Sequence, residues 1–305
     1  MRYVKGRKAM DKMDAAIERL RTAAEMSAHL YKKPLLLTYS GGKDSDVCLE
    51  LANLAGIPFE VQHSHTTADA PETVRHVRQK LHALELEGIP CTISYPYYKG
   101  RRTSMWSLIP QKLMPPTRLV RYCCDVLKEQ TGNDRWIITG VRWAESTRRK
   151  SSRGIHEALG ASKSEGVKLT TDNDDIRKIV EACATKNKRV VNPIIDWTDD
   201  DVWSFLQDRQ VHCNPLYGEF TRVGCIGFPM AGTRGRQRQF IRWPAYKAMY
   251  LCAFEKMLTE RRERGLTTYL WSTAQDVYHL WMEDGVMPGQ IGFFDDVEGA
   301  ANEAR

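Results

Sequence analysis

No stretch of this sequence stays apolar for the about 20 residues that a membrane-spanning helix needs. The basic N-terminus, MRYVKGRKAMDKMDAAIERL, is not followed by an apolar core, so it does not read as a secretory signal. Internal repeats and low-complexity tracts are also missing. These absences predict a soluble, cytoplasmic protein with no membrane partner. They also argue against a disulfide framework among its eight cysteines.

The composition is that of an ordinary globular protein. The chain has 305 residues, of which 42% are hydrophobic and 27% are charged, which suits one large α/β domain with an appendage. The net charge of +7 and the pI of about 8.9 suit an anionic ligand, either a nucleotide or a nucleic acid. A solvated basic surface explains the same charge.

Apolar periodicity predicts strands that alternate with helices. Apolar residues at helical spacing predict a helix over 10–31. Brief apolar runs predict strands at PLLLTY, FEVQH, CTISY, WIITG and within RVVNPIID, with helices over 47–55 and 71–87. This order predicts a doubly wound, mostly parallel, Rossmann-like α/β sheet with its ligand at the carboxyl ends of the strands.

The character of the chain changes near Thr198, where TDDD before VWSFL forms a capping-box-like helix start. A loop rich in Cys, Gly and Pro follows over 213–235, and helices are expected over 244–264 and 274–282. We therefore predict an adenine-nucleotide-binding α/β domain over 1–197 and a helical C-terminal subdomain over 198–305.

The segment SGGKDS follows the first predicted strand and opens a helix. Gly41 and Gly42 let the backbone approach a ligand closely, and consecutive N–H groups at a helix start form an anion nest. Ser40 and Ser45 add hydroxyl groups, and Lys43 adds charge. Asp44 is expected to be a helix cap or an indirect partner of a metal.

This loop is not a Walker A motif. That motif needs a glycine five residues before its Gly-Lys pair, where this chain has Leu37, and a Ser or Thr where it has Asp44. The simpler alternative is a glycine-rich turn that caps a helix. The strand before the loop and the helix after it favour nucleotide binding.

Six segments together carry a family resemblance: YSGGKDSDV, HSHTTADAPETVRHV, RYCCDVLK, ITGVRWAESTRR, NPIIDWTDDDVWSFL and CNPLYGEFTRVGCIGFPM. From about Leu35 to Met230 the chain resembles the phosphoadenosine-phosphosulfate (PAPS) reductase family of the PP-loop adenine-nucleotide α-hydrolase superfamily. The resemblance implies that SGGKDS, a PP-loop, holds the phosphates or a sulfate-bearing group.

The same resemblance implies further site residues. Thr66, Thr67 and Glu72 resemble a nucleotide-contacting loop, and Gly140 and Arg142 resemble the edge of the same site. Arg148 and Arg149 are expected to reach the anionic end of the ligand. The predicted catalytic residues are Ser40, Ser45, Arg142 and Arg148. Surface polar roles, and for Glu72 a favourable charge at a helix N-terminus, are the alternatives.

Two departures from the family pattern stand out. The chain has no match to the Glu-Cys-Gly motif whose cysteine attacks the sulfonate in the reductases. Its last cysteine, Cys252, lies in the expected helix KAMYLCAFEKML, where we predict core packing. Where relatives often read Gly-Cys-x-x-Cys-Pro, this chain has Phe228 at the second cysteine.

The cysteines Cys123, Cys124, Cys213 and Cys225 lie in segments that carry cluster ligands in relatives. A [4Fe–4S] cluster commonly takes four thiolates, and we predict that these four lie close together with or without one. Phe228 favours the alternative, in which the cluster is lost and the cysteines remain as packing or as a zinc remnant.

Basic and aromatic residues alternate in TRGRQRQFIRW. Arg234, Arg236 and Arg238 beside Phe240 and Trp243 suit phosphates and stacked bases, and RWAESTRRKSSR adds a second basic cluster. A solvated face or an internal ion network is the alternative.

The leading functional hypothesis is an enzyme that binds ATP with Mg²⁺ and cleaves it at the α-phosphate, as an adenylating ATP pyrophosphatase. The second hypothesis is a PAPS or adenylyl-sulfate reductase or sulfotransferase, although the missing motif argues against a thioredoxin-dependent PAPS reductase. The third is a nucleotide-binding accessory subunit of a nucleic-acid-processing complex. A homodimer is compatible with each.

Overall fold

A computed structural model describes residues 2–128, 132–159, 167–174, 188–266 and 270–283. The chain divides into two compact units, each built from separate segments. The first unit comprises Met1–Ser64, Ala70–Ser94 and Gln130–Gly224, and the second comprises His65–Asp69, Tyr95–Glu129 and Cys225–Arg305.

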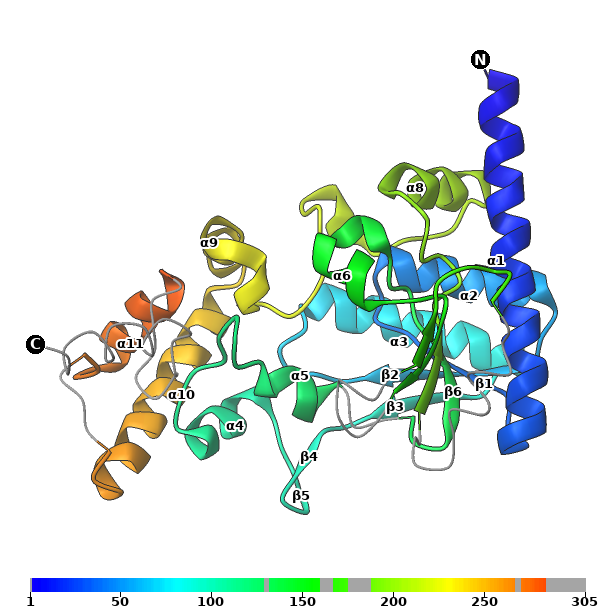
Figure 1. Ribbon diagram of the computed structural model, residues 1–305. Coiled ribbons are helices and arrows are strands. Elements are labelled where there is room, and N and C mark those ends of the chain that lie inside the picture. The colour runs from blue at the N-terminus through cyan, green and yellow to red at the C-terminus, as the bar shows by residue number, and fades with distance from the viewer. Residues whose placement is uncertain (1, 129–131, 160–166, 175–187, 267–269, 284–305) are drawn as a thin grey trace, which may run out of the picture. The chain divides into compact units, whose positions relative to one another are not determined.

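A seven-stranded sheet forms the centre of the first unit (Figure 1). Its strand order is β3-β2-β1-β6-β9-β7-β8, in which the first five strands are parallel and β7 pairs antiparallel with both β9 and β8. The predicted mostly parallel α/β sheet is therefore confirmed. The strands are β1 (Leu35–Thr38), β2 (Phe59–Ser64), β3 (Cys91–Ser94), β6 (Arg135–Ile138), β7 (His156–Leu159), β8 (Val167–Leu169) and β9 (Lys188–Val191).

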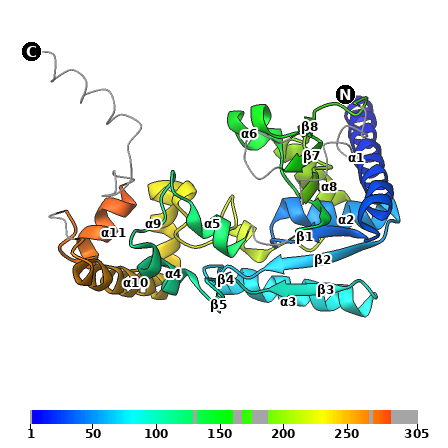
Figure 2. The ribbon, with the colours of Figure 1, turned by 60° about the horizontal axis from the view of Figure 1, so that its bottom comes forward.

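Helices α1, α2 and α3 of the first unit lie against this sheet, and α8 packs on α2. The predicted N-terminal helix is confirmed as α1 and begins earlier than expected, and it packs against α2 and against β1, β6 and β9. In Figure 2, α3 runs alongside β3, which it also contacts. The helices are α1 (Arg2–Tyr31), α2 (Lys43–Ala55), α3 (Pro71–Leu86), α6 (Thr147–Ser152) and α8 (Asp199–Asp208).

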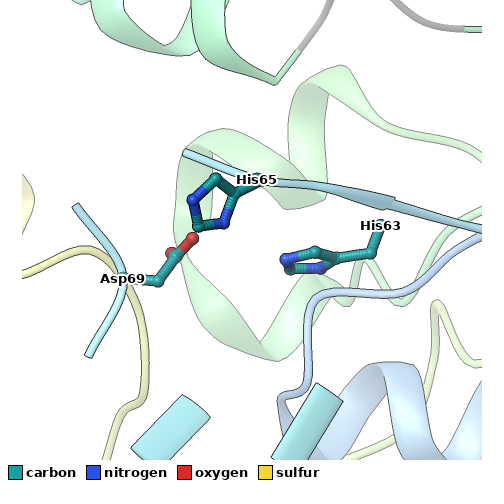
Figure 3. A group of neighbouring side chains, drawn as sticks. All are labelled: His63, His65 and Asp69. Carbon is teal, nitrogen blue, oxygen red and sulfur yellow. The ribbon is translucent and has the colours of Figure 1, made fainter. Parts of the chain in front are cut away.

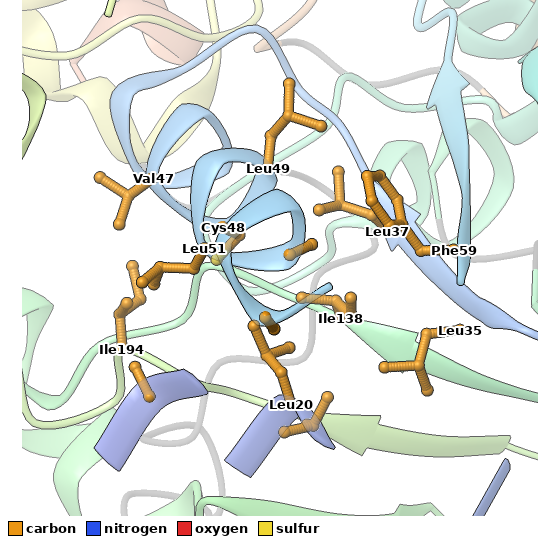
Figure 4. Close-up of a cluster of buried hydrophobic side chains, with 14 of the residues drawn as sticks. Leu20, Leu35, Leu37, Val47, Cys48, Leu49, Leu51, Phe59, Ile138 and Ile194 are labelled. Atoms are coloured by element: carbon orange, nitrogen blue, oxygen red, sulfur yellow. The ribbon is translucent and has the colours of Figure 1, made fainter. Parts of the chain in front are cut away.

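Apolar side chains of α2, of the neighbouring helices and of the strands beside them make the core of the first unit (Figure 4). Leu35 and Leu37 on β1 and Leu51 on α2 are fully buried. The short strand after Pro34 forms because this brief apolar run can be buried in the parallel sheet. The core thereby fixes the turn between β1 and α2, which carries the PP-loop.

The second unit is mainly helical. Helices α4 and α10 lie side by side (Figure 2), and the rings of Tyr250 and Phe254 pack against Trp281 in the core of this unit. Gly227 has φ of +74°, and a Cβ there would lie 2.8 Å from the Tyr250 ring. The elements are β4 (Tyr97–Tyr98), β5 (Arg101–Arg102), α4 (Met105–Lys112), α5 (Tyr122–Leu127), α9 (Gly232–Arg242), α10 (Pro244–Glu263) and α11 (Ala274–Met282).

The two compact units do not coincide with the two segments expected from the sequence. The helix that opens at Thr198 is α8, whose Thr198 side chain accepts the Asp201 N–H as predicted, and it belongs to the first unit. The C-terminal part of the second unit is helical, as expected. A domain boundary at 197/198 stays a prediction. Within the described ranges, no helix is long and apolar enough to cross a membrane.

Candidate functional site

The turn between β1 and α2 has the backbone that its two glycines allow. Gly41 has φ of +75°, and a Cβ at this position would lie 2.6 Å from Cγ2 of Val77. Gly42 is the N-cap of α2, with an extended backbone at φ of −103°. Position 41 therefore requires glycine for both conformation and space, whereas position 42 accepts other residues.

The Ser45 hydroxyl group closes this turn from inside. Ser45 Oγ accepts the N–H groups of Ser40 at 3.3 Å and Gly42 at 3.2 Å, and it donates to the Gly42 carbonyl at 2.7 Å. Among the described residues, the N–H groups of Gly41 and Asp44 have no acceptor. These two donors lie at the N-terminus of α2, which is the arrangement that binds an anion.

A later segment holds the turn from outside. The Tyr217 hydroxyl accepts the Lys43 N–H at 2.8 Å. Asn214 Nδ2 donates to the Gly41 carbonyl at 3.1 Å and to Thr73 Oγ1 at 3.0 Å. Both residues lie in the segment CNPLYG, in which no local sequence pattern indicates a role for them. Only their position in the fold reveals that they fix the PP-loop.

Two cations and two carboxylates form a network beside the loop. Lys43 Nζ lies 3.2 Å from Asp44 Oδ1 and 2.8 Å from Asp199 Oδ1. Arg142 Nε donates to Asp44 Oδ1 at 2.7 Å, and its NH2 donates to Asp199 Oδ1 at 2.8 Å. Lys43 and Arg142 are buried, whereas the Asp199 side chain is 66% exposed.

The network has two consequences for the predicted roles. Hydrogen bonds from Lys43, and then from Arg142, hold the pKa of Asp199 below its ordinary value. Burial lowers the pKa of Arg142, but Asp44 and Asp199 outweigh burial and raise it. The Lys43 ammonium is paired with Asp44 and Asp199, and its contribution to the binding of an anion stays a prediction. Asp44 is also not the helix cap, since Gly42 occupies that position.

Gly140 lies at the end of β6 in contact with the loop. A Cβ there would lie 2.9 Å from the backbone carbon of Asp44. Gly140 and Arg142 therefore adjoin the PP-loop, and their place at the edge of a nucleotide site stays a prediction. Arg149 pairs with Glu145, and Arg148 is exposed on α6, so their contact with an anion stays a prediction.

A buried polar group lies under the loop. The Tyr39 hydroxyl donates to Asp46 Oδ1 at 2.7 Å and lies 3.2 Å from His76 Nε2. Asp46 Oδ2 is buried without a hydrogen-bond partner among the described residues. Burial raises the pKa of Asp46 to about 6 and lowers that of His76 to about 4. Near neutral pH His76 is uncharged, and Asp46 titrates within the physiological range.

The residues Thr66 and Thr67 belong to the second unit. Thr66 Oγ1 lies 3.4 Å from Cys225 Sγ, and Thr67, with φ of +65°, accepts the Met105 N–H at 2.9 Å. Their predicted contact with a nucleotide stays a prediction. Glu72 lies in the first turn of α3, where its charge is favourable at a helix N-terminus, which was the alternative to nucleotide contact.

Three of the four grouped cysteines, Cys123, Cys124 and Cys225, lie in the second unit, and Cys213 lies in the first. A hydrogen bond with Cys124, and then burial, raises the pKa of Cys123; Cys225 adds to the effect. Burial raises the pKa of Cys225. Apolar Phe228 follows Cys225 where relatives often have a further cysteine, so this group of three thiols is one ligand short of a four-thiolate cluster. The grouping with Cys213 stays a prediction.

Polar groups already surround Cys225. Its Sγ lies 3.8 Å from Asp69 Oδ1, and interaction with Cys225, then with Asp69, raises the pKa of Lys128. Figure 3 shows the Asp69 and His65 side chains, which lie within 4.8 Å of each other on the loop after β2; His63, also drawn, lies on β2 in the first unit. The Lys128 ammonium near Cys225 therefore competes with any metal ion for the Cys225 sulfur.

Two residues differ from the sequence expectation. Cys252 is exposed on α10, because Tyr250, Ala253, Phe254 and Met257 form the buried face of that helix. Arg236 is 0% exposed and donates to the carbonyls of Trp281 and Met282, so it cannot contact nucleic acid. Phe240 and Trp243 are also buried, and Arg234 and Arg238 remain exposed.

The parallel sheet, the glycine turn after β1 and the donors at the start of α2 define a PP-loop α/β protein. Residues 34–231, well over half of the chain, match the family described as the phosphoadenosine phosphosulfate reductase domain. The chain belongs to this family.

Individual relatives share low sequence identity with this chain. An uncharacterized protein of Methanocaldococcus jannaschii is 26% identical over 209 residues, 65% of this chain and 36% of that protein. An adenosine 5'-phosphosulfate reductase of Burkholderia cepacia is 26% identical over 129 residues, 41% of this chain and 42% of that enzyme. The chain thus spans less than half the length of these curated relatives. A phosphate complex of PAPS reductase from Candida auris matches with a TM-score of 0.46 and 16% identity, over 69% of this chain and 88% of that one.

Proposed function

We propose that this protein binds ATP with Mg²⁺ at the PP-loop and cleaves it at the α-phosphate. An acceptor oxygen attacks the α-phosphorus, the bond from that phosphorus to the bridging oxygen breaks, and pyrophosphate leaves. The acceptor becomes adenylated and loses its proton to solvent or base. The donors at the start of α2 stabilise the phosphate oxygens as charge develops.

One observation carries the choice of Mg²⁺-ATP, namely the two carboxylates beside the anion-binding turn. Asp44 and Asp199 balance the charges of Lys43 and Arg142, so this network presents no net positive charge to a ligand. Carboxylates repel a metal-free sulfonucleotide, but they are suitable ligands for a Mg²⁺ that also binds phosphates. Asp44 and Asp199 would hold this ion, and when bound it would neutralise charge on the departing pyrophosphate.

The remaining loop residues have binding and positioning roles. Ser45 keeps the turn closed, Ser40 presents its hydroxyl next to it, and Arg142 fixes both carboxylates. Arg148, exposed on α6, is proposed to contact the anionic end of the substrate.

The thiol chemistry favours this function over sulfonucleotide reduction. A reductase needs an accessible thiolate of lowered pKa. In the first unit, burial raises the pKa of both Cys48 and Cys213. A role as an accessory subunit is the further alternative, in which the nucleotide binds without turnover.

The experiment compares ATP and PAPS in calorimetric titrations with and without Mg²⁺, followed by product analysis. We expect Mg²⁺ to strengthen ATP binding at least tenfold, and pyrophosphate to be the product when an acceptor is supplied. Asp199→Asn should reduce this Mg²⁺ effect while improving the binding of metal-free nucleotide.

Asp200→Asn is the matched control, because Asp200 is an exposed neighbour that makes no contact with Lys43 or Arg142 among the described residues. Tighter binding of PAPS than of Mg²⁺-ATP, with sulfite released when thioredoxin is supplied, would overturn the proposal. Tight ATP binding with no product from any acceptor tested would favour the accessory subunit.

A further inference from the structure

A long segment of this chain has no acidic residue. Between Glu87 and Asp125 the sequence contains no aspartate or glutamate. Its basic residues are Lys99, Arg101, Arg102, Lys112, Arg118 and Arg121. A segment whose charged residues are all basic favours a polyanionic partner, provided that these residues are exposed and are not neutralised within the fold.

The structure folds the first part of this segment into a two-stranded hairpin of the second unit. Tyr97 pairs with Arg102 and Tyr98 pairs with Arg101, across the turn at Lys99 and Gly100. Both glycine and lysine at the turn have positive φ, of 75° and 50°. The tip of the hairpin is therefore a tight turn flanked by cations.

The two faces of the hairpin differ. Directly opposed residues share a face, so Tyr97 and Arg102 lie on one face, and Tyr98 and Arg101 on the other. Lys112 of α4 lies 4.5 Å from the Tyr98 ring centre and so covers that ring. On the first face, Arg102 stacks on Tyr95 at 3.9 Å, and the Tyr97 side chain remains 54% exposed.

The cations of the hairpin are not neutralised. Within the described part of the chain, Lys99, Arg101 and Arg102 make no ion pair with a carboxylate, and all three are exposed. The exposed arginines at the end of α10 differ, because Arg262 on the helix and Arg264 just after it form ion pairs with Glu255 and Glu260. The hairpin therefore concentrates unpaired positive charge next to an exposed aromatic ring.

We propose that the β4–β5 hairpin is a binding surface for single-stranded nucleic acid. Lys99 and Arg101 contact phosphates, and the Tyr97 ring stacks on an unpaired base beside the Arg102–Tyr95 pair. Stacking on an aromatic side chain needs a base that is free of its duplex, which selects single strands. This proposal is independent of the reaction at the PP-loop.

An anionic membrane is the rival partner for a basic hairpin. A hairpin that inserts into a bilayer interface carries apolar side chains at its tip. The tip of this hairpin consists of Lys99, Gly100 and Arg101. The two cations can contact a charged membrane surface, but the tip has no apolar side chain that could insert into the bilayer. The aromatic ring lies further down the strand, where a nucleotide chain held by the tip reaches it.

The test uses the full chain and 20-nucleotide fluorescent oligonucleotides, as single-stranded RNA, single-stranded DNA and duplex DNA. Anisotropy titrations at several salt concentrations give the affinity and its salt dependence. We expect single strands to bind more tightly than duplex. Lys99→Gln combined with Arg101→Gln should weaken binding about tenfold and reduce the slope of log K against log salt by about 1.4, since each lost phosphate contact removes about 0.7.

Matched variants separate charge from stacking. Tyr97→Ala should weaken binding at least about fivefold without changing the salt slope, and Tyr97→Phe should retain affinity. Arg262→Gln combined with Arg264→Gln removes equal charge from α10 and should have little effect. The proposal would be overturned if the hairpin variants bound oligonucleotides as tightly as the wild type does. It would also be overturned if the protein bound anionic vesicles but not oligonucleotides. Calorimetric ATP titrations of the same variants should be unchanged, which separates this result from any failure at the PP-loop.

Discussion

The substitution Gly42→Asp separates nucleotide binding from loop stability. Gly42 is the N-cap of α2 with φ of −103°, a conformation that aspartate readily adopts. A Cβ there would lie 3.3 Å from the Tyr217 hydroxyl and 3.5 Å from Ser40 Oγ, so only a small adjustment is needed. Because aspartate is a better N-cap than glycine by a few tenths of a kcal/mol, the variant should be at least as stable as wild type.

The same carboxylate lies where a phosphate must approach the backbone. Two unit charges about 5 Å apart repel by about 1–3 kcal/mol between the dielectric limits of water and a protein surface. The affinity for ATP should therefore fall by a factor of about 5 to 150, while the melting temperature is unchanged or higher. Calorimetric titration and thermal unfolding measure the two quantities on one preparation.

The control Gly42→Ala should show the opposite pattern. Alanine is a poorer N-cap than glycine, so this variant should lose about 0.5 kcal/mol of stability, yet it adds no charge and should keep most of its ATP affinity. Unchanged ATP affinity in a folded Gly42→Asp protein would refute the assignment of the phosphate site to this turn.

Three further predictions concern other parts of the first and second units. The pKa of Asp46 is raised to about 6, so the native state loses up to about 3 kcal/mol as pH rises from about 4 to 6; Asp46→Asn should remove this decline, as urea unfolding at both pH values will measure. Gly140→Ala places a methyl group against the Asp44 backbone and should weaken ATP binding at least about tenfold in a calorimetric titration. Cys252 should react with iodoacetamide in the native protein well before buried Cys48, as peptide mass mapping will show; equal rates would contradict the placement of α10.

The sequence was sufficient for the elements whose signal is local. A brief apolar run before SGGKDS and the Thr198–Asp201 capping box predicted β1, the turn and the start of α8, and the structure contains all three. In each case, neighbours within a few residues determine the conformation. The mostly parallel sheet followed from the alternation of such elements.

Elements and roles that depend on distant partners were not predictable in this way. Strands of two residues, such as β4 and β5, are too short to show alternation. Asp199 looked like one of three aspartates at a helix start, and its contacts with Lys43 and Arg142 arise only because α8 approaches the PP-loop. Arg236 also looked like a surface cation. The carbonyls of Trp281 and Met282, to which it donates, lie 45 and 46 residues away, so no local pattern indicates its burial.

The order in which the two units are assembled from the chain bears on how the protein folds during synthesis. All seven strands of the large sheet precede residue 192, so the first unit can form its sheet while the ribosome is still making the rest. The second unit must wait, because the bridge between Asp69 and Cys225 joins residues separated by 156 positions, and α9 to α11 come later still. Contacts of such long sequence separation form slowly. Until they form, α4 lacks its α10 partner, and its apolar side chains Met105, Leu108 and Ile109 stay exposed to solvent in the nascent chain.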